Sequence, residues 1–167
     1  MNHTLAATVA AALLAAPIHA TAHGEQHHGM MAPGARPISA EEHEFGRQGD
    51  PAKASRTIAI DMSDAMRFSP ADISVKQGET IRFVVRNRGK VMHEMVIGTM
   101  VELKEHGELM KRFPNMEHDE PYMAHVSPGK SEEMAWTFTR PGEYRFGCLE
   151  PGHLDAGMIG RVVVSAR

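Results

Sequence analysis

The amino-acid sequence predicts an all-β domain, an antiparallel β-sandwich or barrel, over residues 55–167. Short runs that alternate between apolar and polar residues begin at Ser55, and this alternation is typical of strands with one buried face. Turn-forming residues separate the runs, at Gln77-Gly78, Asn87-Arg88-Gly89, Pro128-Gly129 and Pro141-Gly142. The segment is also long enough for one domain with its own hydrophobic core.

Residues 1–22 form an apolar leader that contains no Asp, Glu, Lys or Arg. An apolar run from Leu5 to Ala16 is followed by small residues that end at Ala22, which is the pattern of a cleaved signal peptide. The run is too short to span a bilayer, which takes about 20 apolar residues. We therefore expect an exported mature chain that begins at His23 and has no membrane span.

Residues 23–54 read as a flexible leader and linker. The segment is rich in Gly, Pro, His and small polar residues, and Pro33, Pro37 and Pro51 interrupt any regular period. The folded domain is therefore expected to begin at residue 55.

Seven strands follow from the alternating runs. Ile81, Phe83 and Val85 share one face of the third strand, so their side chains are expected in the core. The predicted strands are Thr57–Met62, Asp72–Lys76, Thr80–Arg86, Val91–Ile97, Glu132–Thr139, Glu143–Cys148 and Gly160–Val164.

One helix interrupts the strands. Thr99 and Glu102 have the spacing of a capping box, and apolar residues at helical spacing follow until Pro114 ends the run. The sequence predicts a helix over residues 100–112, packed against one side of the sandwich, and a loop over residues 113–129.

The charge balance argues against a nucleic-acid partner. The chain has 21 acidic and 18 basic residues, a net charge of -3 and only 5% aromatic residues. A nucleic-acid-binding domain needs a basic surface, and this sequence does not predict one.

Cys148 is the only cysteine in the chain. One cysteine cannot form an internal disulfide, and a free thiol in an exported protein is open to oxidation unless a ligand occupies it. The segment CLEPGHLDAGM places His153 and Met158 after the cysteine at even intervals, with glycines that allow tight turns. This spacing predicts a thiolate, an imidazole and a thioether that face one metal ion.

The donor types favour copper. Structural zinc sites use Cys and His, whereas two His and one Cys with a weak axial Met form a blue-copper site. The second imidazole is expected from His93, because it lies in a predicted strand that can run beside the cysteine loop. Four protein ligands leave no open position for a substrate, and the mixed soft and nitrogen donors favour one-electron exchange.

The segments MRFSPADISVKQGETIRFVVRNRGKVMHEMVIG and GEYRFGCLEPGHLDAGMIGRVVV resemble the cupredoxins of the plastocyanin and azurin type. With the His/Met-rich leader, they are most similar to periplasmic cupredoxins associated with copper tolerance. The resemblance implies a Greek-key β-sandwich in which His93, Cys148, His153 and Met158 are type 1 copper ligands. Many electron-carrying members have Asn after the first His ligand, but this chain has Glu94.

Additional copper ions are expected at two other places, because imidazoles and thioethers bind copper. The alternatives are a solvated tail for the first group and ordinary core packing for the methionines of the second. The first group is His23, His27, His28, Met30 and Met31; the second is Met110, Met116, His118, Met123 and His125.

Three functions are compatible with this copper chemistry. Copper tolerance, by sequestration and by oxidation of Cu(I), is favoured by the resemblance and by the soft ligands; catalytic Cu(I) oxidation would make the protein an enzyme, which the sequence leaves open. The alternatives are an electron shuttle to a redox partner protein and a copper metallochaperone. A shuttle is expected to bind one copper ion per chain, and a tolerance protein more than one.

Overall fold

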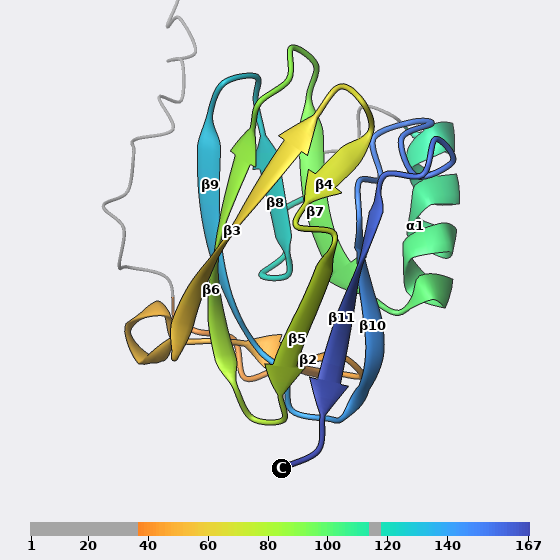
Figure 1. The fold of residues 1–167 in the computed structure, drawn as a ribbon. Helices are drawn as coiled ribbons and strands as arrows, with labels where there is room; N and C mark the ends of the chain where they lie inside the picture. Colours follow the sequence, from red (N-terminus) through yellow and green to blue (C-terminus); the bar gives the residue numbers. More distant parts are fainter. Residues whose placement is uncertain (1–36, 114–117) are drawn as a thin grey trace, which may run out of the picture. The chain divides into compact units, whose positions relative to one another are not determined.

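The computed structural model describes residues 37–113 and 118–167, which form two β-sheets packed face to face and one α-helix (Figure 1). In spatial order, the first sheet contains β1 (Glu42–His43), β2 (Gly46–Gln48), β9 (Ser131–Thr137), β6 (Thr80–Asn87), β3 (Arg56–Ser63) and β4 (Arg67–Ser69). The second contains β5 (Asp72–Lys76), β11 (Ile159–Ser165), β10 (Gly142–Gly147), β7 (His93–Gly98) and β8 (Met123–Val126).

The strand pairing confirms the predicted β-sandwich. Most neighbours are antiparallel, and the exceptions are β3 with β6 and β5 with β11, which pair in parallel. The chain crosses between the sheets several times, so strands that are adjacent in the sequence are often not adjacent in a sheet. All seven predicted strands are present; Asp72–Lys76 has the predicted bounds, and no end of the others differs by more than two residues.

The core lies between the two sheets. Along β6 every second residue is buried, as the alternation predicts, and Ile81, Phe83 and Val85 face inward. Trp136 and Phe146 add fully buried aromatic rings from β9 and β10. Each large apolar side chain that is fully buried stabilises the fold by about 1.5–3 kcal/mol.

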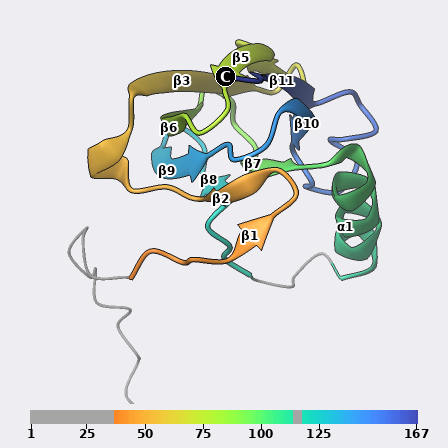
Figure 2. The ribbon, with the colours of Figure 1, turned by 90° about the horizontal axis from the view of Figure 1, so that it is seen from below.

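Helix α1 (Met100–Arg112) has the predicted bounds and the predicted cap. The Glu102 backbone N–H donates to Thr99 Oγ1, and the Thr99 backbone N–H donates to the Glu102 carboxylate. Leu103 and Met110 bury one face of the helix in a second apolar cluster with Val96 of β7. Because α1 packs beside β7 and β10 (Figure 2), β7 is buried on both faces.

The predicted loop over residues 113–129 is partly wrong, because it contains strand β8. This strand is short, pairs only with β7 at the edge of its sheet, and places Val126 in the core. The strand has only four residues, and three of them are buried, so no alternation between buried and exposed positions marks it. Sequence periodicity therefore could not identify the strand.

The folded region also begins before the predicted boundary at residue 55. Residues 37–54 contain β1, β2 and the 3-10 helix η1 (Pro51–Lys53). Phe45 is buried against Trp136, whose indole N–H donates to the Phe45 carbonyl. A single aromatic residue in a Gly- and Pro-rich segment thus anchors that segment to the sandwich.

Residues 1–36, which hold the predicted signal peptide and the His/Met-rich tract, lie outside the described residues. Cleavage near Ala22 and the copper-binding role of the tract therefore remain predictions. Within the described ranges, no helix is long and apolar enough to cross a membrane.

Two glycine substitutions should change stability in opposite directions. Gly160 pairs with Phe146 across β10 and β11, and a Cβ atom there would overlap the Phe146 ring. Gly160→Ala should lower the free energy of unfolding by about 1–3 kcal/mol, because overpacking forces the core to shift. Gly107→Ala in α1 should raise it by up to about 1 kcal/mol, because alanine favours the helix.

Gly107→Ala is the control in this comparison, because the site has room for a methyl group. An added Cβ atom would lie 3.6 Å from Leu154 Cδ2, which is an ordinary van der Waals contact. Urea unfolding of the metal-free protein measures both variants. Equal stability of the two variants would contradict the packing described for Phe146.

Candidate metal centre

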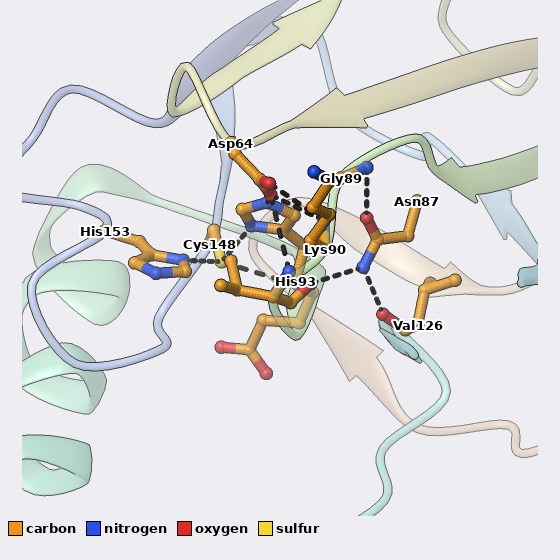
Figure 3. A network of polar contacts seen from close by, with 10 residues as sticks. Asp64, Asn87, Gly89, Lys90, His93, Val126, Cys148 and His153 are labelled. Carbon is orange, nitrogen blue, oxygen red and sulfur yellow. Dashed lines mark hydrogen bonds and ion pairs between the residues drawn. The ribbon is translucent and has the colours of Figure 1, made fainter. Parts of the chain in front are cut away.

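The candidate centre lies at one end of the sandwich, where β7 begins and β10 ends. Gly147, the last residue of β10, pairs with Val96 of β7, so the two strands run side by side at this end. His93 is the first residue of β7, and Cys148 directly follows β10. The strand pairing therefore brings together two residues that are 55 positions apart (Figure 3).

His93, Cys148 and His153 point toward one another. Cys148 Sγ lies 3.2 Å from His153 Nδ1 and 4.0 Å from His93 Nδ1. Among the described residues, these three form the group whose His, Cys or carboxylate donor atoms all lie within 4.8 Å of one another. Two imidazole nitrogens and one sulfur around a common point can hold one metal ion.

Residues 148–158 form a loop that is closed at its base. The Cys148 backbone N–H donates to the Met158 carbonyl, and the Met158 N–H donates to the His153 carbonyl. Gly152 and Gly157 adopt φ values of +86° and +88°, which L side chains rarely adopt. Met158 is fully buried next to the three-donor group through this backbone pairing.

The surroundings of Cys148 disfavour a thiolate without a bound cation. Burial raises the pKa of the Cys148 thiol to about 12. The Glu94 backbone N–H lies 3.4 Å from the sulfur, and the backbone N–H groups of Glu94 and Glu150 are the hydrogen-bond donors that favour the anion. Burial, together with the nearby His93, lowers the pKa of His153, which favours the neutral imidazole with a lone pair available on one ring nitrogen.

Asp64 orients His93, and sequence reasoning missed it. His93 Nδ1 faces the sulfur, and its Nε2 lies 3.2 Å from Asp64 Oδ1 (Figure 3). The carboxylate also accepts the Lys90 backbone N–H, which with His93 holds the Asp64 pKa below its usual range. A carboxylate on the far nitrogen of a metal-binding imidazole fixes the ring orientation. The short turn MSDAM carries no signal for this role.

Asn87 organises the turn that leads into His93. Its side-chain amide donates to the carbonyls of Val91 and Val126, and its oxygen accepts the Gly89 N–H. The residue is almost fully buried, so all three hydrogen bonds are needed to offset its desolvation. Asn87 thereby ties the 88–92 turn to β8.

Glu94 connects the first strand of the centre to the cysteine loop. The side chain is buried, and Oε1 accepts the Leu149 N–H at 2.7 Å. Its other oxygen, Oε2, lies 3.0 Å from His125 Nδ1. That hydrogen bond raises the pKa of His125, which favours the protonated imidazole beside the buried Glu94 side chain. Glu94 thus reaches the cysteine loop from the position where electron-carrying cupredoxins often have Asn.

The second predicted group of copper ligands is divided between two environments. Met110 and Met123 are buried in the apolar cluster beneath α1, which favours the core-packing alternative for both. His118 and His125 lie outside that cluster and close to each other, with ring centroids 5.8 Å apart. Met116 lies outside the described residues.

We expect Glu94→Ala to destabilise the metal-free protein by about 1–3 kcal/mol, because it leaves the buried Leu149 N–H without an acceptor. Glu94→Gln keeps an oxygen that can accept this N–H, so it should lower the free energy of unfolding by less. Denaturant unfolding measures both variants, with exposed Glu132→Ala as the control within about 0.5 kcal/mol of wild type. If Glu94→Ala were as stable as Glu132→Ala, the hydrogen bond from Leu149 to Glu94 would contribute nothing to the stability of the fold.

Comparison with known proteins agrees with this geometry. Residues 54–165 match the family model described as copper binding proteins, plastocyanin/azurin family. The match begins just before β3 and ends with β11, so it covers every strand except β1 and β2 and includes all residues of the candidate centre.

Relatives named copper-resistant cuproprotein CopI match most of the chain. The protein from Rubrivivax gelatinosus is 46% identical over 157 residues, covering 92% of each chain. The protein from Pseudomonas aeruginosa is 37% identical over 149 residues, covering 72% of this chain and 82% of its own.

A solved structure supports the same fold. The reduced auracyanin from the photosynthetic bacterium Roseiflexus castenholzii superimposes with a TM-score of 0.57 at 25% identity. The alignment covers 67% of this chain and 98% of the auracyanin. Since the family model covers most of the chain and the CopI proteins match along its length, the chain belongs to the plastocyanin/azurin family of cupredoxins, close to CopI.

Proposed function

We propose that this cupredoxin binds copper in a type 1 centre formed by His93, Cys148, His153 and Met158, and that it serves in copper tolerance. The protein works in the periplasm after removal of residues 1–22. It sequesters copper and cycles it between Cu(I) and Cu(II) by one-electron transfer.

The observation that carries this proposal is the convergence of His93, Cys148 and His153 at the junction of β7 and β10. A buried thiol between two imidazoles has the donor set of a copper site, and Met158 adds a thioether from the same loop. The high pKa of Cys148 supports the need for a cation here, because a bound metal replaces the thiol proton.

Copper bound at this point supplies one-electron exchange between Cu(I) and Cu(II). The sulfur donors of Cys148 and Met158 favour the reduced ion, and imidazoles suit the oxidised ion. Asp64 holds the ring of His93, while the hydrogen bond between Cys148 and Met158 closes the loop at its base. These contacts keep the ligands in place when the charge changes, and burial excludes water from the sulfur.

Copper tolerance is favoured by the similarity to the two CopI proteins, whose names describe copper resistance. One observation favours an electron shuttle as the second candidate: Val91 and Met92, directly before His93, are exposed large apolar residues. An exposed apolar patch beside a copper ligand suits transient docking of a redox partner protein.

The type 1 assignment predicts that Cys148→Ala loses the intense visible absorption of the copper-loaded protein, because that band needs the thiolate. Met158→Leu is the matched control: it keeps the band, since the thiolate remains, and raises the reduction potential, since Cu(II) loses an axial donor. Visible and electron-paramagnetic spectra with a redox titration measure both variants. A coloured Cys148→Ala protein would refute the ligand assignment.

Growth on copper tests the tolerance role. In a bacterium that lacks its own periplasmic copper defence, the full-length chain should restore growth at an inhibitory copper concentration, and Cys148→Ala should not. Immunoblots must show equal amounts of both proteins. If both proteins protected equally, copper tolerance would not depend on the type 1 centre. If the wild-type protein were coloured but gave no protection, the electron-shuttle function would be favoured.

A further inference from the structure

The turn between β3 and β4 approaches the copper centre from the opposite sheet. Asp64 directly follows β3 in this turn, whereas His93 begins β7 of the other sheet. Figure 3 shows the Asp64 carboxylate beside the His93 ring. The four proposed ligands all come from the second sheet and its cysteine loop, so the first sheet reaches the centre through this turn.

The contact with Asp64 decides which nitrogen of His93 carries a proton. An ionised carboxylate can only accept hydrogen bonds, so Nε2, which lies 3.2 Å from Asp64 Oδ1, must be the donor. In the neutral ring, Nδ1 then keeps its lone pair, and Nδ1 is the nitrogen that faces Cys148 Sγ at 4.0 Å. The ring is therefore set to offer Nδ1 as a donor before any metal ion binds.

The Asp64 carboxylate is fixed by contacts other than its bond to His93. The Lys90 backbone N–H lies 2.8 Å from Oδ2 and 3.0 Å from Oδ1. Gly89 leaves room for the carboxylate, because a Cβ atom at that position would overlap Oδ1. The charge of Asp64 is thus held at one place against the 89–90 backbone.

Arg67 ties the same turn to the cysteine loop. Its Nη1 donates to the Ala156 carbonyl at 3.1 Å and lies 3.4 Å from the Gly157 carbonyl, and these two residues directly precede Met158. Arg67 also pairs with Ser63 across β3 and β4, so the turn between them is short. The turn therefore contacts the centre at two points, through His93 and through the loop that carries Met158.

A negative charge behind the ring of His93 acts unequally on the two oxidation states of copper. A carboxylate that accepts the Nε2 proton makes the imidazole more basic and Nδ1 a stronger donor. Cu(II) carries one more positive charge than Cu(I), so it gains more from the stronger donor and from the nearby negative charge. The Asp64 side chain is 39% exposed, so water weakens this effect.

We propose that Asp64 lowers the reduction potential of the centre by holding its carboxylate on Nε2 of His93, so that the bound copper favours the Cu(II) state. This role rests on the proposed type 1 centre and adds to it the residue that biases its redox balance. A bias toward Cu(II) suits sequestration of the oxidised ion. Asp64 acts through His93, so it is a positioning residue and not a copper ligand.

Redox titration of the copper-loaded protein tests the proposal. Asp64→Asn keeps an oxygen that can accept from His93 and Lys90 but removes the charge, so the type 1 band should remain. The ratio of Cu(I) affinity to Cu(II) affinity should rise by about tenfold, which is a rise of about 59 mV in a one-electron potential. Gly89→Ala displaces the carboxylate without removing it and should raise the potential as well.

Glu143→Gln is the matched control, because it removes an exposed carboxylate near the start of β10, at the opposite end of that strand from Cys148. Its potential should equal that of wild type, since solvent and salt screen a distant surface charge. An Asp64→Asn protein that keeps both the band and the wild-type potential would overturn the proposal. An equal rise in Glu143→Gln would also overturn it.

Nitrogen-15 NMR of the metal-free protein gives a second test that needs no copper. At mildly alkaline pH, the wild-type protein and Asp64→Asn should carry the His93 proton on Nε2, and Asp64→Ala should lose this preference. A proton on Nδ1 in the wild-type protein would overturn the proposal, and this result decides if a variant lacks the type 1 band. A wild-type protein that never shows the band would instead refute the proposed function, and with it the role of Asp64.

Discussion

The antiparallel pairing of β7 with β10 is the constraint on which the centre depends. It sets the start of one strand beside the end of the other, so that His93 meets Cys148 although 55 residues separate them. A one-residue slip in this register would turn every side chain of a strand to the opposite face. The core holds the register, because Phe146 and Met95 are buried from the two strands between the sheets. Core packing and the placement of His93 beside Cys148 are thus set by the same ladder of hydrogen bonds.

A second consequence of this arrangement is that the centre is supported from both sides of its sheet. On the inner side, Cys148 and Met158 belong to the main apolar core. On the outer side, α1 packs on Leu149 and Leu154 of the loop, and Lys111 of the helix pairs with Asp155 at 2.8 Å. The loop therefore lies between the sandwich and the helix, and a buried thiol can be held in place before a metal ion binds.

The sequence predicts the regular parts of this molecule because their signals are local. Alternation located the long strands, the Thr99 and Glu102 pair located the start of α1, and the even spacing after Cys148 located the loop. The remaining features depend on distant contacts. Phe45 becomes a core residue only through Trp136, and His106 meets His118 only when α1 lies beside the segment before β8. Neither the Asp64 contact with His93 nor the His125 contact with Glu94 leaves a local pattern.

The pairing of Glu94 with His125 has a consequence for the history of the family. A neutral side chain at position 94 needs no counter-charge, but a buried carboxylate does, and a buried charge without a partner is costly. Exchanging either residue alone would leave the other with an uncompensated group, so the two positions are expected to change together between lineages. A cupredoxin that acquires Glu after its first histidine ligand would thus need a cation on the neighbouring edge strand. Covariation of these two positions would distinguish lineages with Glu at position 94 from lineages with a neutral side chain there.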